Sequence, residues 1–459
     1  MVVQHNMQAM NANRMLNVTT SAQSKSTEKL SSGYRINRAA DDAAGLTISE
    51  KMRKQIRGLD QASTNAEDGV SSVQTAEGAL TEVHSMLQRM NELATQAANG
   101  TNSKDSDRQA IQDEIDQLTT EIDRVSETTK FNETYLLKGD KGATKNVYMN
   151  GHDAGLKGTL TDSAKSATFV MDELKAGDKV TIAGKEYSIG STADEAKASY
   201  AKAAAGDKVT IDGTEYTVVD AATGTEDADN NELIVTSLDG KVKDGSVVSY
   251  KTSKLTVMTD KNNDGVDDDD SSVISKDVAE GKILSELTAA NNIGTVDQAA
   301  TVAKAAANGK TTYTITKGYA TVADTLSFNL HVGADADMTN KINVSIDSMD
   351  SASLGIKGLN IKDDSGNAAT YAVDAISDAI SKVSSQRSSL GAVQNRLEHT
   401  INNLDNVVEN TTTAESRIRD TDMASEMVNY SKNNILAQAG QSMLAQANQS
   451  TKGVLSLLQ

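Results

Sequence analysis

The chain has 459 residues, enough for two to four domains, and a formal net charge of −19 at pH 7. It contains no Cys, Pro or Trp. This excludes disulfides, thiolate metal sites and cysteine nucleophiles, and it favours long helices because Pro breaks the helical hydrogen-bond ladder. The acidic charge argues against nucleic acid or an anionic membrane surface as the main partner.

The N-terminal segment, residues 1–24, is amphipathic through amides and hydroxyls instead of ions. It holds seven Asn or Gln and one formal charge, Arg14, and it does not resemble a secretory signal peptide because it lacks a basic region followed by an apolar one. No run of eighteen apolar residues occurs anywhere, so we expect no membrane insertion. The chain is expected to be cytoplasmic, or exported by a route that does not cleave a signal. Met7 and Met10 are candidates for self-association.

A strict seven-residue apolar repeat begins at Met52 and predicts a long helix with a coiled-coil seam. Its large positions are Leu59, Val73, Leu80 and Leu87, and a second row three residues further on completes an a/d pattern over six heptads. After AANGTNSKDS, a second seam between Ile111 and Val125 predicts another helix. These patterns indicate a helix bundle.

The middle of the chain, residues 143–359, has the alternation typical of strands. The segments KVTIAGKEYSI, ELIVTSL, TTYTITKG, TLSFNLHV and KINVSIDSM alternate polar and apolar residues between Gly and Asp. AGDKVTIAGKEYSI begins at Ala176, and AGDKVTIDGTEYTV begins at Ala205. Both copies predict a hairpin with a Gly-containing turn. Two copies indicate the duplication of a small β unit, because a solenoid needs at least three.

One acidic motif, DKNNDGVDDDDSS (Asp260 to Ser272), resembles part of an EF-hand calcium loop. Asp260, Asn262, Asp264 and Gly265 match positions 1, 3, 5 and 6 of that loop, but position 12 is Ser271 instead of Glu. The flanking residues predict strands, not helices. We favour an acidic surface turn over a calcium site.

The C-terminal part repeats the pattern of the N-terminal part. A heptad row predicts a long helix, and a final helix is expected from Val428 to the end of the chain. The heptad row consists of Ile376, Val383, Leu390, Leu397 and Leu404. The apolar stripe of the final helix includes the self-association candidates Ile435, Met443, Val454, Leu455 and Leu458.

These elements predict an α+β protein with long N- and C-terminal helices in a coiled-coil bundle and a β-rich central insertion projecting outward. We expect terminal helices at 1–41 with 411–459, a helical core with β-hairpins at 42–175 with 320–410, and an outer domain at 176–319. An isolated, nearly uncharged amphipathic helix is marginal in water. The ends of a free monomer are therefore expected to be unfolded and to order against other copies, in a ring or an open helical filament.

The sequence carries no pattern of an enzyme. None of the five His lies in H-E-x-x-H, there is no Cys, and no phosphate-binding glycine motif is present. We expect no catalytic activity, no cofactor and no metal.

Long stretches at both ends resemble bacterial flagellin. They include KLSSGYRINRAADDAAGLTISEKMRKQIRGLDQASTNAEDGVSSVQTAEGAL near the N-terminus. Near the C-terminus they include SSQRSSLGAVQNRLEHTINNL, AESRIRDTDMASEM and VLSLLQ. The resemblance covers about 140 residues at the N-terminus and about 95 at the C-terminus.

This resemblance implies an extracellular filament of many copies that serves motility. It also implies export as an unfolded chain through the flagellar secretion channel, an export chaperone at the C-terminal helix, and contacts with filament cap and hook-junction proteins. An innate immune receptor of the host is a further implied partner. The positions that match its recognition pattern are Arg89, Leu93 and Glu114, although Leu93 flanks the seam and both charges are also consistent with a solvated surface.

Two alternatives stay open at the level of sequence. A hook–filament junction protein would share the terminal helices, and a calcium-dependent surface adhesin would use the insertion. The intact core helices and the terminal VLSLLQ favour a main filament subunit.

Overall fold

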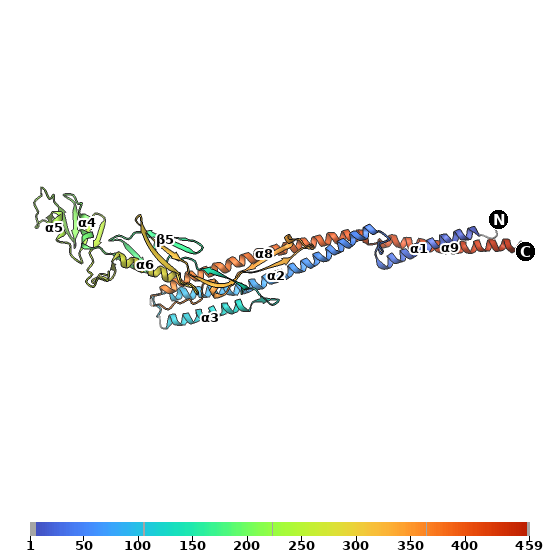
Figure 1. Ribbon diagram of the computed structural model, residues 1–459, viewed down its shortest axis with the longest axis horizontal. Helices are drawn as coiled ribbons and strands as arrows, with labels where there is room; N and C mark the ends of the chain where they lie inside the picture. The colour runs from blue at the N-terminus through green and yellow to red at the C-terminus, as the bar shows by residue number, and fades with distance from the viewer. Residues whose placement is uncertain (1–5, 104–105, 223, 364, 457–459) are drawn as a thin grey trace. The chain divides into compact units, whose positions relative to one another are not determined.

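The computed structural model describes residues 6–103, 106–222, 224–363 and 365–456. Long helices occupy both ends of the chain, and a β-rich region lies between them in sequence, which confirms the predicted α+β class (Figure 1). The chain forms two compact units. Unit 1 comprises Met1–Val73, Phe328–Val344 and Ala392–Gln459, and unit 2 comprises Gln74–Ser327 and Ser345–Gly391.

The two chain ends pair in unit 1 as antiparallel helices, α1 (Met7–Ser32) and α9 (Met423–Ser456) (Figure 1). Asn6 caps α1 by accepting a hydrogen bond from the backbone of Ala9, and its amide donates to the carbonyl of Ala447 at 3.1 Å. Further along the pair, Leu16 packs against Gly440, where the absent side chain lets the helices approach closely. The amide-rich sequences at the two ends thus pair with each other within one chain.

The remainder of unit 1 joins parts of two long helices to a small β element. These helices are α2 (Ala43–Ala97) and α8 (Asn367–Arg419), and each continues into unit 2. In unit 1 they run antiparallel, with Ser49 donating to Glu415 at 2.8 Å and Ser63 donating to Asp405 at 3.2 Å. The β element contains most of β17 (Leu326–His331), η1 (Met338–Asn340) and most of β18 (Lys341–Ile346). Its core is Ala66, Val332, Ile342 and Leu397.

In unit 2, the helical part adds α3 (Asp107–Thr128) beside α2. The turn between them is fixed by Arg108, whose buried guanidinium donates to the carbonyls of Ala97 at 2.9 Å and Asp363 at 2.7 Å. Short elements complete this part. They are β1 (Lys130–Phe131), β2 (Thr134–Tyr135), the antiparallel pair β3 (Asp140–Tyr148) and β16 (Tyr319–Asp324), and α7 (Ser351–Leu354).

A four-stranded sheet begins the central β-rich region, in the order β14-β15-β5-β4. Helix α6 (Lys276–Asn291) packs on it, and the core between them includes Phe169, Leu287 and Tyr313. The strands are β4 (Thr159–Asp162), β5 (Ser166–Asp172), β14 (Thr301–Ala307) and β15 (Lys310–Thr316).

Both copies of the internal repeat form β-hairpins. The first is β6 (Lys179–Ile182) with β7 (Lys185–Ile189), and the second is β8 (Lys208–Ile211) with β9 (Thr214–Val218). Each has a two-residue turn with positive φ at both positions, 54° and 75° in Ala183-Gly184 and 51° and 81° in Asp212-Gly213. This is the geometry of a type I′ turn, for which Gly is favoured.

The structure also contains a third, degenerate copy of this hairpin, β11 (Val247–Tyr250) with β12 (Ser253–Thr256). Its base is closed by a hydrogen bond from Gly245 to Val257, as Gly206 bonds to Val218 and Gly177 bonds to Ile189 in the other copies. The three glycines all have positive φ. The unit therefore occurs three times, where the sequence pattern indicates two.

Each hairpin is followed along the chain by a short extended segment and a helix. The three helices are α4 (Ala193–Tyr200), α5 (Val235–Asp239) and α6, and two of the extended segments are β10 (Glu232–Leu233) and β13 (Val273–Ile274). The strand expected over ELIVTSL is wrong after its second residue. The chain turns into α5 there, and the turn lets Leu238 enter a small core with Tyr200 and Val248.

Candidate functional site

The paired terminal helices carry an unusual number of exposed apolar side chains. The pairing of α1 and α9 covers only one side of each helix, and the exposed residues lie elsewhere on them. They are Met7, Met10, Met15, Val18, Met423, Met427, Val428, Ile435, Leu436 and Met443. So many exposed large apolar side chains along one helix pair point to an interaction surface. We call these ten residues the terminal apolar face.

Four of the predicted self-association residues belong to the terminal apolar face. Met7 is 68% exposed and Met10 61%, while Ile435 and Met443 are 66% and 62% exposed. Val454 and Leu455 lie in the last turns of α9, and Leu458 lies outside the described residues. The sequence pattern did not single out Met15, Val18, Met423, Met427 and Leu436, although their spacing on the same helices carries the same signal.

The predicted heptad residues occupy the interior of the two units. Eight of the nine are buried: Val73, Leu80, Leu87, Ile376, Val383, Leu390, Leu397 and Leu404. Leu59 is half-buried and, together with Val332, Arg396 and His399, lines a groove of about 760 Å³ in unit 1. The heptad row therefore supplies the packing that holds the long helices, and the terminal helices supply the exposed apolar surface.

The three candidate receptor contacts differ in exposure. Arg89 lies on the surface of α2, where its guanidinium donates to Glu114 of α3 at 2.9 Å and to Glu92 at 3.2 Å. The hydrogen bonds from Arg89 to these two carboxylates raise the pKa of the guanidinium. Leu93 is only 2% exposed. The Arg89–Glu114 pair is therefore at the surface, whereas Leu93 belongs to the interior.

The acidic motif at 260–272 folds into a loop whose carboxylates accept backbone hydrogen bonds. Asp260 accepts from the N–H groups of Asp264 at 3.1 Å and Gly265 at 2.8 Å, and Asp267 accepts from Thr259 at 2.8 Å. In the part of the chain that the structure describes, no three His, Cys, Asp or Glu side chains are grouped so that they could hold a metal ion. Among the same residues, every helix is too short or too polar to cross a membrane.

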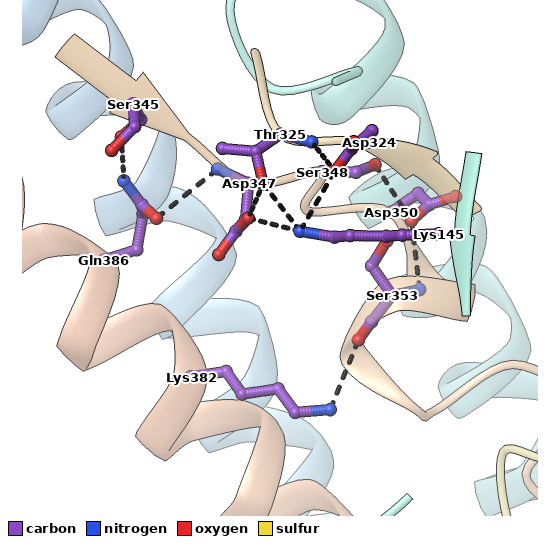
Figure 2. Close-up of polar contacts among 10 residues, drawn as sticks. All are labelled: Lys145, Asp324, Thr325, Ser345, Asp347, Ser348, Asp350, Ser353, Lys382 and Gln386. Carbon is purple, nitrogen blue, oxygen red and sulfur yellow. Dashed lines mark hydrogen bonds and ion pairs between the residues drawn. The ribbon is translucent and has the colours of Figure 1, made fainter. Parts of the chain in front are cut away.

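A polar pocket of about 450 Å³ in unit 2 was not predicted from the sequence. Figure 2 shows its two lysines, Lys145 from β3 and Lys382 from α8. Lys145 donates to Asp347 at 2.6 Å and to Thr325 at 2.7 Å. Lys382 donates to the carbonyl of Ser353 at 3.3 Å. The elements that carry these groups are far apart in sequence, so no local sequence motif predicts the pocket.

Comparison with known proteins identifies the two ends of the chain. Residues 3–142 match the bacterial flagellin N-terminal helical region, and residues 373–458 match the bacterial flagellin C-terminal helical region. Among solved structures, the chain is similar to FliC from Burkholderia pseudomallei, at 19% identity and a TM-score of 0.28 over 72% of this chain and 99% of that one. It is also similar to flagellar hook-associated protein 3 from Legionella pneumophila, at 15% identity and a TM-score of 0.34 over 80% of this chain and 98% of that one.

Curated relatives extend the similarity over the whole length. A flagellin of Clostridium tyrobutyricum is 40% identical over 98% of this chain and 100% of its own length. A flagellin of Bacillus subtilis strain 168 is 35% identical over the full length of both chains, and flagellin C of Vibrio anguillarum is 36% identical over 99% of both. The chain therefore belongs to the bacterial flagellins, a family of structural subunits of the extracellular flagellar filament and not of enzymes.

Proposed function

We propose that this chain is a main filament subunit for motility and that it polymerises through the terminal apolar face. The observation that carries the proposal is the exposure of ten large apolar side chains on α1 and α9, next to amides instead of ions. Burying a Met, Leu, Ile or Val side chain stabilises an assembly by about 1.5–3 kcal/mol. Amide and hydroxyl neighbours can be buried with hydrogen bonds at less cost than ions. Contacts between copies are therefore the natural cover for this face.

The test is a pair of charge-matched variants of the full chain. Ile435→Asp with Met443→Asp places two carboxylates on the terminal apolar face at exposed positions, so the two compact units should fold as before. Gln438→Asp with Gln441→Asp adds the same charge to exposed polar positions of the same helix. Filament growth followed by light scattering and electron microscopy should be lost in the first variant and kept in the second. Normal filaments from the first variant would refute the proposal.

Export and accessory partners are proposed from the chain's membership of the flagellin family. We propose that the chain crosses the flagellar secretion channel unfolded, that a chaperone holds α9 before export, and that cap and hook-junction proteins contact the filament ends. A chain without Cys or Pro forms no disulfide and has no slow prolyl isomerisation to delay threading. Whole-length similarity to flagellins supports the filament role over that of a junction protein.

We further propose that an innate immune receptor of the host contacts the exposed Arg89–Glu114 pair. Because Leu93 is buried, Leu93→Ala should reduce recognition only to the extent that it lowers stability, whereas Arg89→Ala should reduce recognition with the melting temperature unchanged. A receptor-reporter assay on purified monomer, paired with thermal melting, separates the two effects. Equal loss of signal in both variants at equal stability would contradict the assignment.

A further inference from the structure

The pocket shown in part in Figure 2 belongs to unit 2 and is lined by both apolar and polar residues. Met349 and Leu354 are among its apolar lining residues and are buried. Four serines also line it: Ser348, Ser353 of α7, and Ser385 and Ser389 of α8. The pocket therefore combines several hydroxyls with apolar side chains.

One of its two ammonium groups is already neutralised. Lys145 is held at 2.6 Å from Asp347 and also donates to Thr325. Gln386 fixes the same wall, because its amide donates to the carbonyl of Ser345 at 3.1 Å and its oxygen accepts from the backbone of Asp347 at 3.4 Å. These groups satisfy one another and leave no charge for a ligand.

Lys382 is different. Among the contacts of the described residues, its ammonium makes one hydrogen bond, 3.3 Å to the carbonyl of Ser353, although an ammonium has three N–H donors. Asp378, one turn earlier on α8, faces His152 at 3.4 Å. Burial lowers the pKa of the Lys382 amine, with Asp378 opposing and Lys317 adding to that effect.

The hydroxyl of Ser353 is the second unused donor. Ser353 is 6% exposed and lines the pocket, and its buried Oγ has no hydrogen-bond partner among the residues that the structure describes. Most buried hydroxyls in proteins have a partner, so an orphan hydroxyl beside an under-bonded ammonium points to a missing ligand. Both groups donate, which calls for an anionic acceptor.

We propose that this pocket binds one carboxylate group, with the Lys382 ammonium and the Ser353 hydroxyl as donors. A singly charged group fits better than a phosphate dianion, because the carboxylate of Asp378 already acts on Lys382. The carboxylate is an acidic side chain of a second copy, an assignment that rests on the proposed polymerisation. Each copy has 64 acidic and 45 basic residues. At a contact between copies, a carboxylate therefore either pairs with a lysine or faces another carboxylate.

The pH dependence of binding has a definite sign. A carboxylate stabilises the charged amine, so its affinity falls as the pH rises through the lowered pKa of Lys382. Of the charged groups that face this amine, Asp378 favours its charged form, Lys317 disfavours it, and Lys145 is paired with Asp347. Arg stays charged over this range, so Lys382→Arg should remove the pH dependence.

The experiment uses filaments grown from an equimolar mixture of ¹⁴N- and ¹⁵N-labelled chains and a zero-length carbodiimide crosslinker. Mass spectrometry of the digest should find Lys382 joined to an Asp or Glu peptide, with half of the product carrying mixed labels. Lys382→Met should lose this product and raise the critical concentration at least tenfold. Lys382→Arg should raise it less than threefold. Lys357→Met, an exposed lysine of the same unit outside the pocket, should change nothing.

A second arm measures the unassembled chain, so that it is informative even if filaments do not form. Acetate at constant ionic strength should raise the melting temperature of the parent relative to chloride, and Ser353→Ala should reduce that rise without lowering the melting temperature in chloride. An acetate effect without any mixed-label crosslink would overturn the second copy as the source and keep the carboxylate chemistry. The absence of both the crosslink and the acetate effect would overturn the proposal that this pocket binds a carboxylate.

Discussion

The carboxylate of Asp347 accepts hydrogen bonds from Lys145 of β3 and from Thr325, which precedes β17. Burial by itself would raise the pKa of Asp347, but these two donors outweigh it and hold the pKa below its usual value. The pair joins positions 202 residues apart in sequence. The Lys145–Asp347 contact therefore links the two ends of the β-rich region where they meet α8.

A pH-dependent stability follows from this lowered pKa. A carboxyl whose pKa is lower in the folded state stabilises the fold fully above its unfolded pKa of about 3.9 and loses that effect as the pH falls through the folded value. Asp347→Asn should therefore lower the free energy of unfolding at pH 7, and its difference from the parent should shrink below about pH 4. Urea titrations at pH 7 and pH 3 measure both values. An equal difference at the two pH values would contradict this role for Asp347.

Single residues also show which features of the fold could be predicted from the sequence and which could not. The burial of Val73, Leu80, Leu390 and Leu397 follows from a heptad period, because a helix face repeats along the chain. The pocket around Lys382 does not, since its walls come from β3, the segment around α7, and α8. No periodicity links such distant segments, so only the folded structure brings them together.

At the scale of elements, the hairpin repeat also shows a feature of the fold that the sequence could predict only in part. The first two copies share nearly identical sequences, whereas the third keeps mainly its base, Gly245 with Val257, and a positive φ at Lys251. Backbone hydrogen bonds preserve a unit after its side chains have diverged, so the third copy is visible in the structure alone. ELIVTSL was misassigned for a related reason, because a buried Leu238 is compatible with either a strand or a short helix.

The central region contains two separate hydrophobic cores, so a deletion can remove one core without opening the other. One core draws only on residues 193–257, and the other uses residues on both sides of that segment. The segment starts and ends at one place, where Ser191 donates to Thr256 at 2.8 Å and accepts from Met258 at 3.0 Å. Replacing residues 191–257 by two glycines should leave the melting of the remaining chain and its polymerisation largely unchanged.

Removing the larger segment 176–309 provides the contrast. It would take α6 and β14 away from Phe169 and Tyr313, which are fully buried in the sheet core. That variant should show a second, lower melting transition and bind a hydrophobic dye, as expected when a core is opened. Calorimetry of both deletion variants measures their melting transitions and tests this contrast. A destabilised chain after the smaller deletion would show that the two cores depend on each other.

At the scale of the whole molecule, apolar attraction between terminal helices acts against a charge of −19 on every copy. Salt screens like charges over about 10 Å at 0.1 M ionic strength and leaves apolar burial intact. The critical concentration for polymerisation should therefore fall as sodium chloride rises from about 0.02 to 0.2 M. Sedimentation of filaments at a series of salt concentrations tests this. A rising critical concentration would place ion pairs, instead of apolar contacts, at the centre of assembly.

The most direct test of folding coupled to assembly is amide hydrogen exchange on the same preparation before and after filament growth. Neither terminal helix has an interior of its own: Ala437 and Ser26 are among the few buried residues of α9 and α1. We predict that residues 1–40 and 411–459 exchange rapidly in the monomer and are protected in the filament, while α2 and α8 within the core are protected in both. Terminal helices that are already protected in the monomer would contradict this prediction, because the pairing of α1 with α9 would then be stable without a second copy.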